Sequence, residues 1–136
     1  MSREEYAQLL NLLLECERAG AKLLAAYCDE LPRESEQRAW LGVIQRDEAR
    51  NCATLMRLLR EQGVQPSAAV GDFYRKGLNI RGWQERLAFL NRGQQWVAGR
   101  IAAALPQISQ FAEGRRSLGA MLGSHLLNMH VCEELV

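Results

Sequence analysis

Six polar side chains occupy positions where the surrounding sequence is apolar, and their types could bind a metal ion or carry protons. They are Glu17, Glu48, Asn51, Gln94, His125 and Asn128. Burying a carboxylate or an amide costs several kcal/mol unless the group is paired, hydrogen-bonded or bound to a metal. One such residue can be an accident of packing. A layer of them indicates a site or the remains of one.

Four long amphipathic segments must position these side chains. Apolar residues at steps of three and four predict helices over about 2–30, from 32–35 to 63, over 83–105, and from 109–115 to the end of the sequence. The same period places Glu17 on the core side of the first helix and Glu15 on the opposite side. Strand patterns are absent from the sequence, which therefore predicts an all-α four-helix bundle in a single domain, residues 1–136.

Counting along the helices puts the six polar residues at one depth. Glu17 lies fifteen residues before Pro32 and Glu48 sixteen after it, while Gln94 lies twelve before Pro106 and His125 eleven after Gly114. Short turns within each helix pair and a long connection between them, about residues 64–82, predict two antiparallel hairpins joined by a crossover. At about 3.3 Å per residue, this linker is long enough to run the length of a helix.

Composition excludes several functional classes. The formal net charge of +1 argues against charge-driven binding to nucleic acid or to a membrane surface, and the apolar runs are too short for a membrane span. The first residues are too polar for a signal peptide. Four isolated cysteines without CxxC spacing indicate reduced thiols. We therefore expect a cytoplasmic protein.

The pattern of polar positions resembles the ferritin-like superfamily. In di-iron members of that superfamily, two helices each supply one carboxylate and the other two each supply an ExxH pair. Here Glu17 matches the first carboxylate, Glu48–Asn51 the first ExxH, Gln94 the second carboxylate, and His125–Asn128 the second ExxH. The chain is similar to bacterial proteins of the rubrerythrin and bacterioferritin type, with a degenerate di-iron site. The resemblance also implies a homodimer.

The departures from this pattern suggest three hypotheses for the layer. The leading one is a metal-free polar network in a non-catalytic, structural or interaction bundle, in which Asn51, Gln94 and Asn128 satisfy the charged groups. The second is a mononuclear Fe, Mn or Zn site that uses Glu17, Glu48 and His125, with the three amides orienting these ligands. The third is a small-ligand pocket in the bundle core. A conventional di-iron centre is not expected, and whether the protein is an enzyme stays open.

Other residues, near the layer and elsewhere, are interpreted as structural. Cys52 and Cys132 border it and are interpreted as buried structural thiols, although soft metal ligands or a redox pair fit the same positions. Gly119 and Gly123 share one helix face and predict close helix contact. Trp40, Trp83 and Trp96 are interpreted as packing anchors, and His130 as a surface histidine.

Overall fold

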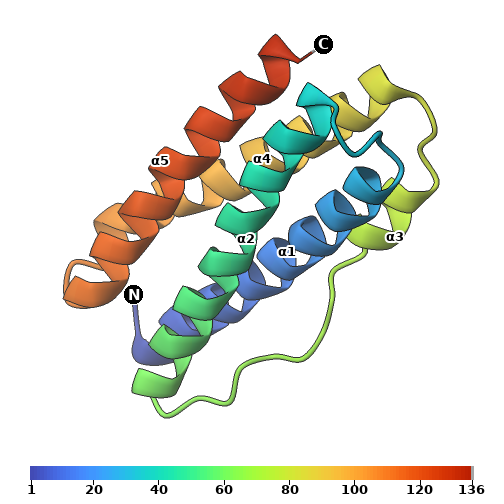
Figure 1. Cartoon of the computed structure of the whole chain (residues 1–136). Coiled ribbons are helices and arrows are strands. Elements are labelled where there is room, and N and C mark those ends of the chain that lie inside the picture. Colours follow the sequence, from blue (N-terminus) through green and yellow to red (C-terminus); the bar gives the residue numbers. More distant parts are fainter. Residues whose placement is uncertain (136) are drawn as a thin grey trace.

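The computed structural model describes residues 1–135 and contains α-helices and one short 3-10 helix over that range (Figure 1). Their bounds are α1 Arg3–Asp29, α2 Glu36–Glu61, α3 Phe73–Leu78, α4 Trp83–Ala104, η1 Leu105–Gln107 and α5 Ala112–Glu134. The all-α prediction is confirmed. Among these residues, none of the helices is both long and apolar enough to cross a membrane.

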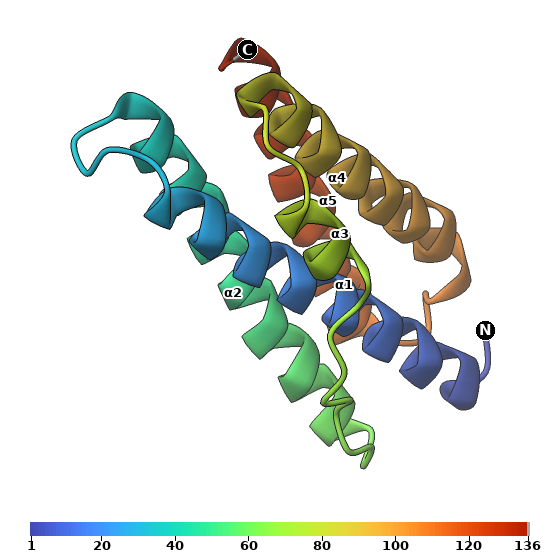
Figure 2. The same cartoon turned by 90° about the vertical axis from the view of Figure 1, so that its right-hand side faces the viewer.

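The long helices form two antiparallel pairs, α1 with α2 and α4 with α5 (Figures 1 and 2). The connection from α2 to α4 runs along the outside of α1 and contains the short helix α3, which packs against α1 and α4. This is the predicted crossover, with one added turn of helix that the sequence pattern did not reveal.

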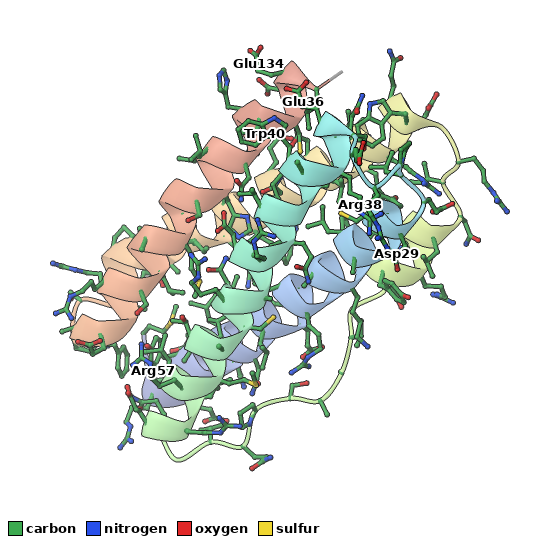
Figure 3. The ribbon with its side chains drawn as sticks, in the orientation of Figure 1. Asp29, Glu36, Arg38, Trp40, Arg57 and Glu134 are labelled. Atoms are coloured by element: carbon green, nitrogen blue, oxygen red, sulfur yellow. The ribbon has the colours of Figure 1, made fainter. Side chains whose placement is uncertain are left out.

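Local chemistry sets the helix ends. Ser2 caps α1 through a capping box with Glu5, and the Ser35 hydroxyl accepts a hydrogen bond from the Arg38 amide at 3.1 Å to start α2. Gly63 follows α2 with a positive φ of 72°, the left-handed conformation that glycine adopts without penalty. An ion pair between Arg38 and Asp29, 4.0 Å apart, lies at the turn that joins α1 to α2 (Figure 3).

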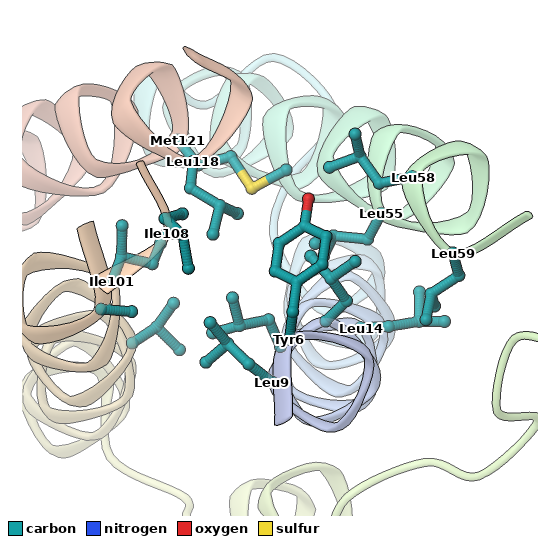
Figure 4. Close-up of a cluster of buried hydrophobic side chains, with 14 residues drawn as sticks. Tyr6, Leu9, Leu14, Leu55, Leu58, Leu59, Ile101, Ile108, Leu118 and Met121 are labelled. Atoms are coloured by element: carbon teal, nitrogen blue, oxygen red, sulfur yellow. The ribbon is translucent and has the colours of Figure 1, made fainter. Parts of the chain in front are cut away.

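Two apolar clusters fill the bundle, one at each end. The first contains side chains of α1 between residues 6 and 14 and of α2 between residues 55 and 59, together with side chains of α4 and α5 (Figure 4). Tyr6 of this cluster stacks on Phe111 with ring centroids 4.0 Å apart. The second contains Leu23, Leu24 and Tyr27 of α1, with side chains of α2, α4 and α5. On each long helix, the predicted polar residues lie between the segments that build these clusters. The polar layer therefore separates two apolar cores.

The crossover is fastened to the bundle at its short helix. Phe73 lies over Gly93 of α4 and its ring centroid is 4.3 Å from that of Phe89, while Tyr27 donates a hydrogen bond to the Gly77 carbonyl at 2.8 Å. An added Cβ at Gly93 would lie 2.6 Å from the Phe73 ring, so glycine permits this contact. These contacts place α3 beside the middle of the bundle.

Two expectations about large and small residues are wrong. Trp40 and Trp96 are 42% and 49% exposed, so neither is a buried anchor. Trp40 lies near the upper ends of α2 and α5 in Figure 3. Gly119 and Gly123 have no heavy atom within 4 Å of an added Cβ, so these glycines face open space and not a neighbouring helix. A three-to-four-residue period assigns a face only approximately, and residues at its margin can point outward.

Candidate functional site

All six polar residues of the layer are buried. Their exposed fractions range from 1% for Glu17 and His125 to 9% for Asn51. The prediction that these side chains face the bundle interior is thus confirmed. Glu17 comes from α1, Glu48 and Asn51 from α2, Gln94 from α4, and His125 and Asn128 from α5.

His125 connects three helices through its two ring nitrogens. Its Nε2 is hydrogen-bonded to Glu17 Oε1, and its Nδ1 donates to Gln94 Oε1 at 3.3 Å. An amide oxygen can only accept, so Nδ1 carries a hydrogen. The contact between Nε2 and Glu17 then needs one further proton, which belongs to either the imidazole or the carboxyl group. Both ring nitrogens are therefore engaged by the protein itself.

Glu48 lies against the backbone of α1 at Gly20. A Cβ added at Gly20 would be 2.5 Å from Glu48 Oε2, so the glycine makes room for the carboxylate. Glu48 Oε2 is buried and has no hydrogen-bond partner, and the same holds for Glu17 Oε2. Burial raises the pKa of Glu48 well above its usual value, and the charges of Glu17 and Asp47 raise it further. The site thus favours a protonated Glu48 or an added hydrogen-bond donor.

Within the described residues, none of the three amides is hydrogen-bonded to Glu17 or Glu48, so the expectation that they satisfy these two carboxyl groups is wrong. Asn128 donates to Asp47 Oδ2 at 3.3 Å, and Asn51 Nδ2 is buried without a partner. Gln94 Nε2 makes a long contact of 3.9 Å to Cys132 Sγ. Asp47 is not among the six residues predicted to form the layer, yet its carboxylate accepts a hydrogen bond from Asn128 and its charge raises the pKa of Glu48. Its position next to Glu48 was the signal that could have identified it.

A cavity of about 380 Å³ adjoins the layer. Glu17, Glu48, Gln94 and His125 line it, whereas Asn51 and Asn128 are not among its lining residues. The remaining wall is largely apolar and includes α3 and the residues before it. The crossover therefore covers the side of the bundle on which the polar side chains line the cavity.

The cysteines near the layer are buried or half-buried thiols. Cys52 and Cys132 are free, and burial raises their pKa to about 11 and about 12. Thiols that remain protonated are poor nucleophiles and poor metal ligands. His130 is on the surface, 3.9 Å from Glu134, as its position outside the stripe predicted.

Two of the three residues proposed as ligands of one metal ion, Glu17 and His125, are hydrogen-bonded to each other, whereas Glu48 Oε2 has no partner. In the part of the chain that the structure describes, no cluster of three or more His, Cys, Asp or Glu side chains has the geometry to hold a metal ion. Metal coordination by His125 Nε2 and Glu17 Oε1 would have to replace their mutual hydrogen bond.

The fold is similar to that of ferritin-like proteins. The chain superposes on the crystal structure of a ferritin-like, diiron-carboxylate protein from Bacillus anthracis str. Ames with a TM-score of 0.85, at 15% sequence identity and over 99% of both chains. The chain belongs to the family described as a domain of unknown function, DUF6306, which matches residues 4–134. No curated protein matches the sequence. The resemblance to ferritin-like proteins is therefore confirmed for the fold.

The buried side chains do not fit the dinuclear centre that this fold carries in di-iron proteins. Such a centre uses about four carboxylates and two imidazoles to neutralise and coordinate two cations. The layer here provides two carboxylates, one imidazole and three neutral amides. The imidazole is also hydrogen-bonded on both sides within the protein. The chain therefore has this fold with a different set of polar contacts at its centre.

Proposed function

We propose that this protein is a non-catalytic ferritin-like bundle in which a polar network takes the place of a di-metal centre. The contacts of His125 to Glu17 and Gln94 carry the proposal, because they join α5 to α1 and α4 without a metal. A metal-bound histidine offers one ring nitrogen to the ion and donates from the other to an orienting partner. Here both nitrogens contact protein side chains.

A network of this kind gives the bundle specificity more than stability. Buried polar contacts can fix one register of packed helices because a shifted register leaves them unsatisfied. Loss of metal chemistry within a retained fold also suits a structural or interaction role.

Exposed apolar side chains on α2 and α5, namely Trp40, Val43, Leu126 and Leu127, support the proposal that the chain forms a homodimer. Light scattering after size-exclusion chromatography tests that state.

Metal content tests the central proposal. The protein is expressed with added iron, manganese and zinc, purified without chelator, and analysed for each element. We expect less than about a tenth of an equivalent of any metal and a thermal midpoint that EDTA leaves unchanged. About one equivalent, lost in Glu17→Gln and His125→Asn variants, would instead establish the mononuclear site of Glu17, Glu48 and His125.

A further inference from the structure

The cavity beside the polar layer presents buried acceptor atoms that the chain does not satisfy. Glu17 and Glu48 both line it, are 1% and 6% exposed, and each has an Oε2 atom without a hydrogen-bond partner. A carboxyl oxygen in such surroundings is destabilised unless a donor reaches it. His125 is hydrogen-bonded to the other Glu17 oxygen, and no described residue donates to either Oε2 atom, so both atoms are open to a donor supplied by a ligand.

The rest of the cavity suits an apolar body. Its wall includes Leu24, Ile44, Phe73, Leu90 and Val97. The volume is about 380 Å³, more than twice that of an engineered apolar cavity that holds one benzene molecule. On that scale, the space accepts a compact molecule of roughly 7 to 12 non-hydrogen atoms. Asp72, Lys76 and Trp96 are exposed lining residues and place the opening beside α3 and α4.

We propose that this cavity binds a small organic monoamine, with the ammonium group at Glu17 and Glu48 and the apolar body against the aliphatic wall. A primary ammonium group has three donors and no acceptor, which complements acceptor-only carboxylates. Its charge also compensates theirs at a place where both carboxyl groups are buried. The inference rests on the metal-independent site proposed above, since a metal ion would occupy the same oxygens.

The charged groups around the cavity favour a cation over an anion. Glu17 and Glu48 are at its inner end, and Asp47 adds negative charge near Glu48. At the opening, Asp72 and Lys76 carry opposite charges and are both exposed. His125 is already hydrogen-bonded to Glu17 and Gln94. A carboxylate ligand would bring a third anionic group to the inner end, and an alcohol would supply one donor in place of three.

Calorimetry with EDTA-treated protein of measured metal content tests the proposal. The probes are hexylamine, 2-phenylethylamine and 4-phenylbutylamine, each compared with the alcohol and the carboxylate of matching carbon skeleton. We expect at least one amine to bind with a Kd below about 1 mM, and its alcohol and carboxylate counterparts to bind at least about tenfold more weakly. Equal binding of a counterpart, or no amine binding below about 10 mM, would overturn the proposal.

A variant pair and a spectroscopic measurement locate the binding. Glu48→Gln should weaken amine binding by about tenfold or more, whereas Glu133→Gln, at an exposed glutamate of α5, should leave it unchanged. Methyl NMR of the unsubstituted protein should show the largest amine-induced shifts at Leu24, Ile44 and Val97. This measurement locates the ligand even if the Glu48→Gln variant does not fold. Equal losses in both variants, or shifts confined to other methyl groups, would contradict this location.

The two proposals fail in different ways. Metal-free protein that binds no amine refutes the amine site and leaves the polar network standing. A purified protein that carries about one equivalent of metal, and binds amine only after the metal is removed, refutes the metal-independent network while supporting the amine preference of the emptied site.

Discussion

Replacing Gly20 by alanine tests the packing of the Glu48 carboxylate on α1. The added Cβ would lie 2.5 Å from Glu48 Oε2 and 2.9 Å from Cδ, closer than real Cβ contacts. Glu48 would have to move within a site where it is 6% exposed. We therefore expect a loss of stability at a position where alanine otherwise favours the helix.

The magnitude follows from two opposing effects. Alanine in place of glycine within a helix is favourable by about 1 kcal/mol, and overpacking a buried site costs about 1–3 kcal/mol. The lower part of that range, about 1–2 kcal/mol, applies here because the overlapped atoms are the end of a flexible side chain that lines a cavity. Gly20→Ala should then lose up to about 1 kcal/mol of unfolding free energy. The matched control is Gly123→Ala in α5, where an added Cβ meets no atom within 4 Å and the gain should be about 1 kcal/mol.

Urea unfolding followed by far-UV circular dichroism measures both variants, alone and combined with Glu48→Ala. When the carboxylate is removed, Gly20→Ala should become as favourable as Gly123→Ala, because the atoms it overlaps are gone. The reasoning is refuted if Gly20→Ala is as stable as Gly123→Ala in the unsubstituted protein. A loss that persists undiminished in the Glu48→Ala background would refute it equally.

Three further predictions concern the site and its cover. The pKa of Glu48 is raised from its usual 4.5 by burial, Glu17 and Asp47, so the stability tied to its proton is present below about pH 4.5 and is lost as the pH rises towards the folded-state pKa. Glu48→Gln should flatten this pH dependence in urea titrations and be the more stable form at neutral pH; an unchanged slope would contradict this. Phe73→Ala should cost about 2 kcal/mol and speed proteolysis within residues 64–82, because the ring fastens the crossover, and equal cleavage rates would argue otherwise. Cys132, whose pKa burial raises to about 12, should react with maleimide far more slowly in the folded protein than in urea, and similar rates would show that the thiol is accessible.

Much of the fold could be predicted from local chemistry. Ser2, Ser35 and Gly63 mark helix ends through contacts within a few residues, so their effect does not depend on the rest of the chain. The helix α3 was not predicted, because six residues are too few to show a helical period, and its position depends on Phe73 contacting Gly93. The exposure of Trp40 and Trp96 was missed for a related reason: an aromatic residue beside an apolar stripe is buried only if another helix covers it.

The sequence by itself determined that six polar side chains share one depth in an all-α bundle. Helical periodicity fixes the direction of each side chain, and the distance from each turn fixes its height. Only the tertiary structure decided which of these groups meet. Hydrogen-bond partners such as His125 and Glu17 are 108 residues apart, and their contact depends on how two hairpins pack. The same packing puts Glu48 against Gly20 and forms a cavity beside the layer. One wall of this cavity comes from the crossover, whose path no local pattern specifies.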